Sequence, residues 1–192
     1  MMHRKLMAAA AIALTLIATV LTSQADAAPA APGGLVPLKA AVTGVRPHST
    51  AAAWIRIHSL YGNKGQCLDA DATNGGNGTR VQVWACNGSS QQAWYSTDDG
   101  FLINGRFQSM CLDADLNGGG NNGTVLQLWQ CNSTSQQQWW TRANDLAIYN
   151  GRFLNNFNTC VDRDTNGPDN GARAQLWQKN FQPQQWWEIL AA

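Results

Sequence analysis

Two residue types recur at matching places in the chain and together could bind a sugar. Each of three cysteines is followed two positions later by an aspartate, and a tryptophan comes later in the same unit. A pyranose has one apolar C–H face and a rim of hydroxyl groups. An indole ring can cover that face, while an ionised carboxylate accepts two hydroxyl protons in charge-assisted hydrogen bonds. The three pairs are Asp69 with Trp84, Asp113 with Trp129, and Asp162 with Trp177.

Each residue type also has a structural interpretation. The tryptophans could be additional core residues, and the aspartates could form turns through their short side chains. The presence of both types in all three units favours the binding interpretation. The second aspartates of the motifs, Asp71, Asp115 and Asp164, are better explained as turn caps or as contacts to the edge of a sugar.

The pairs belong to a threefold internal repeat. The segments "QVWACNGSSQQAW" (82–94), "QLWQCNSTSQQQW" (127–139) and "QLWQKNFQPQQWW" (175–187) align without a gap. Such self-similarity indicates that one supersecondary unit occurs three times. The repeats span approximately residues 54–98, 99–143 and 144–190.

Each repeat is predicted to contain short strands and tight turns. In the second, "FLING", "SMCLDA", "VLQLWQ" and "QQWWT" are strand-like and are separated by turns rich in Gly and Asn. No segment has the apolar stripe of a helix of about ten residues. Propellers need about four or more blades, so three four-stranded units suit a closed pseudo-threefold barrel better. We therefore predict an all-β fold, a β-trefoil of three four-stranded repeats.

The Q-x-W residues that end each repeat are expected to be structural. Their tryptophans are large apolar side chains that can fill the centre of a small barrel. Their glutamines lie two positions earlier, on the same face of the strand, and a buried amide must be hydrogen-bonded, here on a neighbouring loop. The residues are Trp94, Trp139 and Trp187, with Gln92, Gln137 and Gln185.

The cysteines indicate two disulfides and one odd thiol. The predicted pairs are Cys67–Cys86 and Cys111–Cys131, each closing one long loop and contributing about 3 kcal/mol in the chain-entropy model. Lys179 stands where the partner of Cys160 is expected. We interpret Cys160 as a buried thiol, with a covalent dimer as the alternative. The third site should then be weaker but functional, because ordering its loop on binding costs conformational entropy. Lys179 acts against this as a donor at the rim, for a sugar hydroxyl or for Asp162.

The first part of the chain is predicted to lie outside the domain. Residues 1–27 combine a basic start, an apolar run from Leu6 to Leu21 and an Ala-x-Ala site, as in a secretory signal peptide; a membrane anchor is the alternative. Residues 28–53 are rich in Ala, Pro and Gly and are predicted to be a linker or extended tail. Residues 54–192 form the domain. The protein is expected to be extracellular.

Charge argues against nucleic-acid and membrane partners. Of 13 basic and 12 acidic residues, Arg4, Lys5 and Asp26 lie in the signal, so eleven of each sign remain. A nucleic-acid or anionic-membrane partner normally requires a basic stripe, and the sequence has none. We expect neither nucleic acid binding nor membrane insertion.

The sequence also argues against an enzyme and a metal site. Beyond the signal there is one glutamate, Glu188, and the aspartates recur with the threefold pattern, unlike the asymmetric carboxyl pair of a glycosidase. His48 lies in the linker and His58 in the first strand, which does not suit a serine triad. The calcium-loop openings "DADLNG" and "DRDTNG" have Thr124 and Arg173 where a bidentate Glu is needed. No metal or cofactor is predicted.

The combined motifs resemble those of the ricin B-type (R-type) lectins and the related secreted carbohydrate-binding modules of bacterial glycosidases. Three Q-x-W, three C-L/V-D and three W-x-C/K motifs occur in one order over nearly all of the chain after the linker. The resemblance implies a β-trefoil in which each repeat can hold a shallow sugar pocket.

The resemblance also implies roles for residues in each pocket. Asp69, Asp113 and Asp162 would grip two sugar hydroxyls, and Trp84, Trp129 and Trp177 would be the stacking platforms. The polar lining would be Gln82, Gln127 and Gln175, with the Q-x-W glutamines Gln92, Gln137 and Gln185 completing the sites. The position before Q-x-W is often Asn in the family, but here it is Gln91, Gln136 and Gln184.

The sequence thus predicts a secreted, monomeric, non-catalytic carbohydrate-binding protein with up to three shallow sites. Galactose-type and xylan-type glycans are both open as ligands, bound multivalently. The alternatives are a β-trefoil inhibitor of another protein and a targeting module of a glycoside hydrolase system.

Overall fold

The computed structural model describes residues 34–42, 54–142, 145–154 and 158–192. The predicted signal peptide (1–27) and most of the predicted linker lie outside these residues. Within them, the regular elements are β-strands and short 3-10 turns, which confirms the all-β prediction. None of the helical turns in the described part of the chain is long and apolar enough to cross a membrane.

Six strands form a closed barrel. They are β2 (Trp54–Ser59), β5 (Trp94–Ser96), β6 (Leu102–Asn104), β9 (Trp139–Arg142), β10 (Ile148–Asn150) and β13 (Trp187–Ala191). Antiparallel pairing joins β2 to β5, β5 to β6, β9 to β10 and β13 to β2. The ring is completed by a bridge between Phe101 and Gln138 and by a 2.7 Å hydrogen bond from the Trp187 amide to the Leu146 carbonyl.

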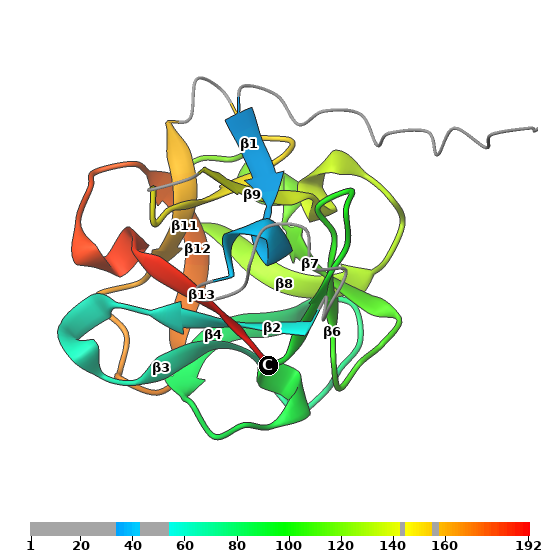
Figure 1. Cartoon of the computed structure of the whole chain (residues 1–192), viewed down its shortest axis with the longest axis horizontal. Helices are drawn as coiled ribbons and strands as arrows, with labels where there is room; N and C mark the ends of the chain where they lie inside the picture. Colours follow the sequence, from blue (N-terminus) through cyan, green and yellow to red (C-terminus); the bar gives the residue numbers. More distant parts are fainter. Residues whose placement is uncertain (1–33, 43–53, 143–144, 155–157) are drawn as a thin grey trace, which may run out of the picture.

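Three hairpins cap one end of the barrel. They are β3 (Gln66–Ala70) with β4 (Thr79–Ala85), β7 (Met110–Ala114) with β8 (Thr124–Gln130), and β11 (Thr159–Arg163) with β12 (Ala172–Gln178). The second strands of the hairpins also pair with one another, β4 with β8, β8 with β12 and β12 with β4. Each repeat therefore contributes four strands to a pseudo-threefold β-trefoil, as predicted (Figure 1).

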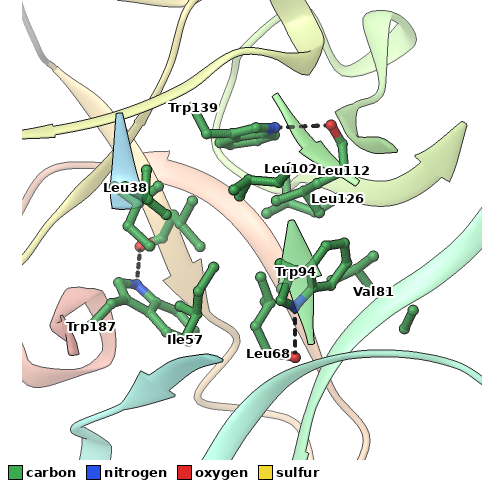
Figure 2. Packing of buried hydrophobic residues seen from close by; sticks show 14 of the residues in the cluster. Leu38, Ile57, Leu68, Val81, Trp94, Leu102, Leu112, Leu126, Trp139 and Trp187 are labelled. Carbon is green, nitrogen blue, oxygen red and sulfur yellow. Dashed lines mark hydrogen bonds between the residues drawn. The ribbon is translucent and has the colours of Figure 1, made fainter. Parts of the chain in front are cut away.

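The Q-x-W tryptophans fill the centre of the core, as expected. Trp94, Trp139 and Trp187 have at most 2% of their surface exposed. Each indole N–H donates to a backbone carbonyl of its own repeat's hairpin, at 3.2, 2.9 and 3.0 Å (Figure 2). The accepting residues are Leu68, Leu112 and Val161, each directly before a motif aspartate. Core packing therefore also fixes the strand that carries the aspartate.

The prediction that residues 28–53 are linker or tail is wrong for residues 34–42. Strand β1 (Leu35–Pro37) pairs antiparallel with β9, and the 3-10 turn η2 (Leu38–Ala41) follows it (Figure 1). Leu38 has no exposed surface and belongs to the main core cluster. The run "LVPL" is too short to show a period in the sequence, and it is buried because the rest of the barrel offers it an apolar surface.

Leu38→Ala should therefore lower the free energy of unfolding by roughly 2–5 kcal/mol, because it leaves a cavity in a packed core. Denaturant unfolding measures the loss. Lys39→Ala is the matched control, since Lys39 forms a surface ion pair with Asp98 at 2.7 Å and its removal should cost at most about 1 kcal/mol. Equally small losses for both variants would contradict the assignment of this turn to the core.

Candidate functional site

Each hairpin carries the predicted aspartate and tryptophan on one face. In the first, Asp69 lies opposite Gln82, and Cys67 lies opposite Trp84. Side chains alternate along a strand, so these four share the face away from Leu68 and the core. The same register places Asp113 opposite Gln127 and Asp162 opposite Gln175.

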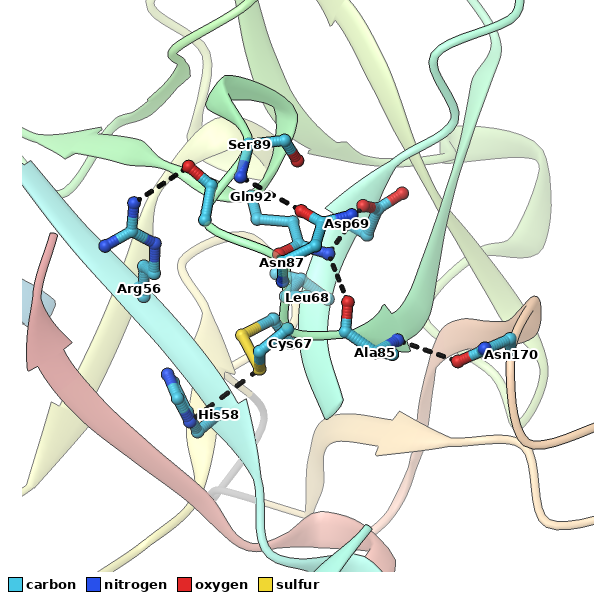
Figure 3. Close-up of a disulfide and its surroundings, with 12 residues drawn as sticks. Arg56, His58, Cys67, Leu68, Asp69, Ala85, Asn87, Ser89, Gln92 and Asn170 are labelled. Atoms are coloured by element: carbon cyan, nitrogen blue, oxygen red, sulfur yellow. Dashed lines mark hydrogen bonds between the residues drawn. A yellow bond between two sulfur atoms is a disulfide. The ribbon is translucent and has the colours of Figure 1, made fainter. Parts of the chain in front are cut away.

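Two glutamine amides hold each carboxylate. Asp69 Oδ1 accepts a hydrogen bond from Gln82 Nε2 at 3.2 Å, and Oδ2 accepts one from Gln92 Nε2 at 3.0 Å; Figure 3 shows the second contact. The equivalent bonds are Gln127 and Gln137 to Asp113 (3.2 and 3.1 Å) and Gln175 and Gln185 to Asp162 (3.2 and 3.1 Å). A carboxylate oxygen accepts about two hydrogen bonds, so each retains capacity for a ligand hydroxyl.

The Q-x-W glutamines position the carboxylates. Gln92 Nε2 also donates to the Ala85 carbonyl at 3.0 Å, and its Oε1 accepts from the Asn87 amide at 2.9 Å. Gln137 and Gln185 make the same two contacts. All three are buried at the ends of 3-10 turns η4 (Ser90–Gln92), η6 (Ser135–Gln137) and η8 (Pro183–Gln185). This supports the structural interpretation of the three glutamines, because their amides are hydrogen-bonded inside the protein.

The other tryptophans are half-exposed. Trp84, Trp129 and Trp177 have 40%, 39% and 37% of their surface exposed, although the residue directly before each is in the core. The core interpretation is therefore wrong for these three, and their geometry suits a stacking platform. Among the residues before Q-x-W, Gln91 and Gln184 are partly exposed, whereas Gln136 is buried.

Burial changes the charge properties of the three aspartates. Desolvation raises the pKa of Asp69 and Asp113 above the usual value, although the glutamine hydrogen bonds act against it. The same cause raises the pKa of Asp162 to about 6. These carboxylates are hydrogen-bond acceptors that are shielded from solvent, where a charge-assisted hydrogen bond is stronger than in water.

The second aspartates of the motifs cap turns, as predicted. Asp71, Asp115 and Asp164 each accept a hydrogen bond at Oδ1 from the backbone amide two residues later, at 3.0, 3.0 and 2.9 Å. This is the Asx-turn geometry that such residues favour. The resemblance to a calcium loop is explained by these turns.

In the third repeat, an open hollow of about 330 Å³ is lined by the motif carboxylate. Asp162, Gln175 and Trp177 line it together with Asp164, Asn180 and Gln184. Carboxylate, polar lining and aromatic platform of one repeat thus meet in one cavity, and Gln184, at the position before Q-x-W, reaches it.

The cysteine predictions are confirmed. Cys67–Cys86 and Cys111–Cys131 are disulfides (Figure 3 shows the first). Cys160 is a free, fully buried thiol, which argues against a covalent dimer, and burial raises its pKa to about 12. His58 in β2 approaches Cys86 Sγ with Nδ1 at 3.8 Å. His58, Cys67 and Cys86 lie close enough together to suggest a metal site. The two sulfurs are joined in a disulfide, however, and so are not thiolate ligands.

An ion pair occupies the place of the missing third disulfide. Lys179 Nζ donates to the two carboxylate oxygens of Asp145 at 3.0 and 2.8 Å and to the Tyr149 hydroxyl. The expected pair of Lys179 with Asp162 is not formed, because Lys179 pairs with Asp145. Burial acts to raise the pKa of Asp145, but hydrogen bonds from Lys179 and Tyr149 and the lysine charge hold it below its usual value. The third loop is therefore anchored, without a covalent bond.

Three asparagines that the sequence analysis missed hold the platform strands. Each lies in an Asn-Gly turn of one long loop and accepts, at Oδ1, the amide directly after a platform tryptophan of a different repeat. The bonds are Ala85 to Asn170 (2.7 Å), Gln130 to Asn77 (2.7 Å) and Gln178 to Asn122 (2.6 Å); Figure 3 shows the first. The recurring "NG" was visible in the sequence, but the strand that it reaches belongs to another repeat.

Solved structures share this fold. ThreeFoil, a designed threefold-symmetric protein, is 18% identical, with a TM-score of 0.63 over 73% of this chain and 99% of that chain. The C-half of the earthworm R-type lectin, solved with GalNAc, is 17% identical, with a TM-score of 0.57 over 72% and 98%. The Vibrio vulnificus hemolysin/cytolysin β-trefoil lectin, solved with N-acetyl-D-lactosamine, is 24% identical, with a TM-score of 0.57 over 74% and 96%.

A family model gives the assignment at the level of sequence. Comparison with curated proteins finds no significant relative. The model of the ricin-type beta-trefoil lectin domain, however, matches residues 53–187, which include all three repeats. With three glutamine-clamped aspartates and three half-exposed tryptophans on a β-trefoil, the chain belongs to the ricin-type β-trefoil lectin family.

Proposed function

We propose that the protein is a secreted, non-catalytic lectin that binds glycans at three surface sites. One observation carries the proposal: a half-exposed tryptophan stands on the same hairpin face as an aspartate clamped by two glutamines, and this arrangement occurs three times. Indole and carboxylate match the apolar face and the hydroxyl rim of a pyranose. Secretion is supported by the signal-like residues 1–27 and by two disulfides, which persist in oxidising compartments.

The sites favour binding over hydrolysis. A glycosidase needs two carboxyl groups with different environments flanking one bond. Here the three motif aspartates share one environment, and Glu188 lies in barrel strand β13, paired with His58. The repeat places equivalent groups in equivalent pockets, which suits several binding sites on a monomer.

We propose two candidate classes of glycan, in order of preference. Galactose-type glycans are the first candidates, because two similar structures contain GalNAc and N-acetyl-D-lactosamine. Xylan-type polysaccharides are the second. Such sites suit a lectin that acts alone, and they also suit the targeting part of a glycoside hydrolase system.

A glycan array with a matched variant tests this function. The wild-type protein should bind one glycan class, and Trp84→Ala/Trp129→Ala/Trp177→Ala should lose that binding while unfolding at nearly the same temperature. Binding that survives in the triple variant would exclude the three sites. No glycan binding by the wild-type protein, with capture of a protein partner, would favour the inhibitor alternative.

Acid should weaken the third site. As the pH falls through about 6, Asp162 gains a proton and can no longer accept two ligand hydroxyls. Its pKa is higher in the folded than in the unfolded chain, so its stabilising effect on the fold is present at low pH and is lost as the pH rises through about 6. The loss of binding is therefore not caused by Asp162-dependent unfolding.

The measurement is retention of Trp84→Ala/Trp129→Ala on an immobilised glycan between about pH 7.5 and pH 4.5, a range that brackets the titration. Melting temperatures over the same range control for unfolding. Constant retention with an intact fold would show that the ionised carboxylate is not the acceptor.

A further inference from the structure

The loop after Trp177 exposes an aromatic residue in an unusual backbone conformation. Phe181 is 70% exposed and has a φ of +59°. A bulky residue with positive φ is an outlier, and such strain clusters at binding sites, where the surrounding structure maintains it. Exposure also denies the ring the hydrophobic stabilisation that it would gain inside the fold. Folding alone gives no reason for a phenylalanine here.

The equivalent loops of the other two repeats have the same backbone conformation, but only the third repeat carries an aromatic ring there. Gly88 and Ser133 occupy the same position with φ of +74° and +59°. In all three loops the preceding asparagine accepts a hydrogen bond at Oδ1 from the backbone amide two residues later, at 2.9, 3.2 and 3.0 Å. The third repeat has thus placed an aromatic side chain where glycine or serine is sufficient for the turn.

Phe181 lies in the chain between two residues that line the third site. Asn180 directly before it and Gln184 shortly after it both line the same hollow as Asp162. The same loop is tied to the carboxylate, because Gln185 accepts the Asn180 amide at 2.8 Å and donates to Asp162 at 3.1 Å. A ring on this loop is therefore held at a fixed place relative to the proposed sugar contacts.

The ring also contacts a lysine that is itself fixed. Lys179 Nζ lies 4.9 Å from the centroid of the Phe181 ring, within the range of a cation–π contact. Lys179 is itself fixed by Asp145. The lysine that replaces the second cysteine of the repeat thus supports an aromatic surface that remains mostly accessible to solvent.

We propose that Phe181 makes the third site a two-unit site for a glycan chain. One sugar contacts Trp177 and Asp162, and the next sugar along the chain lays its apolar C–H face on the Phe181 ring. A phenyl ring offers no hydrogen bond, so it adds affinity for a neighbouring sugar without selecting its hydroxyl pattern. Sites one and two, with Gly88 and Ser133, take a single unit. The inference rests on the proposed lectin function.

The experiment compares sugar lengths at the isolated third site. The parent is Trp84→Ala/Trp129→Ala, and the matched variant adds Phe181→Ser, the residue of the second repeat. The probes are xylose, xylobiose and xylotriose, and galactose with its dimer and trimer, measured by calorimetry. In the series that binds, the variant should lose roughly 3- to 10-fold in affinity for the dimer and trimer and keep its affinity for the monosaccharide. Its melting temperature should be equal or higher, because the strain of the bulky side chain is relieved.

The reciprocal change tests whether the ring is sufficient. In Trp84→Ala/Trp177→Ala, which retains only the second site, Ser133→Phe should raise affinity for the dimer over the monosaccharide. Equal affinities of the third-site parent for monomer and dimer would overturn the proposal and leave the lectin function intact. A Phe181→Ser loss that is the same for every length would also overturn it, because it would show an effect on loop order. Absence of wild-type binding to both series would remove the proposed function and this inference together.

Discussion

Replacing Trp94 with alanine should lower the free energy of unfolding by about 3–5 kcal/mol, whereas Trp84→Ala should leave the melting temperature nearly unchanged and remove one sugar site. Trp94 has no exposed surface, and its indole N–H donates to the Leu68 carbonyl beside Asp69. Its loss leaves a cavity and an unpaired carbonyl in the core. Trp84 is 40% exposed, so truncation leaves no enclosed cavity.

Denaturant unfolding and glycan retention of the two variants, measured side by side, separate the two roles. Trp139→Ala and Trp187→Ala should repeat the result of Trp94→Ala, because both are buried and donate to the equivalent carbonyls. If Trp84→Ala unfolds the protein, its assignment as a sugar platform is wrong. If Trp94→Ala is as stable as the wild-type protein, the core does not depend on the threefold tryptophan cluster.

The apparent affinity for a polysaccharide should exceed the affinity for a monosaccharide by about 10²- to 10⁴-fold. A shallow single site with a dissociation constant near a millimolar corresponds to only about 4 kcal/mol. The three hairpins are related by pseudo-threefold symmetry, so the sites face different directions and can engage separate parts of one polymer or surface. Once one site is occupied, the others bind at a high effective concentration.

Stepwise removal of sites gives the clearest measurement. Single, double and triple substitutions of Trp84, Trp129 and Trp177 should reduce polysaccharide retention progressively and far more than they reduce monosaccharide affinity per remaining site. Calorimetry provides the monosaccharide values. Equal affinities for monomer and polymer would contradict multivalent binding while leaving each single site in place.

The repeat determined most of the fold from the sequence. The motifs recur in one register, so each local pattern occurs three times within the chain. The strand count, the disulfides and the core tryptophans could therefore be predicted from the repeat. The segment 34–42 could not be predicted in this way. It belongs to no repeat, and Leu38 is buried only because barrel residues far along the chain supply the surface that it covers.

The sequence by itself also predicted which residues belong to the candidate sites, but the tertiary structure decided how each one is placed. Asp69, Trp84 and Gln92 are all polar or aromatic residues of one motif set, yet Asp69 is a buried acceptor, Trp84 is exposed and Gln92 is a buried donor to the Asp69 carboxylate. Exposure depends on which face of the hairpin meets the core, which a motif does not specify. The Lys179–Asp145 pair and the Asn170 contact to Ala85 likewise join distant parts of the chain. Such contacts depend on how the three repeats close on one another, and closure is a property of the whole barrel.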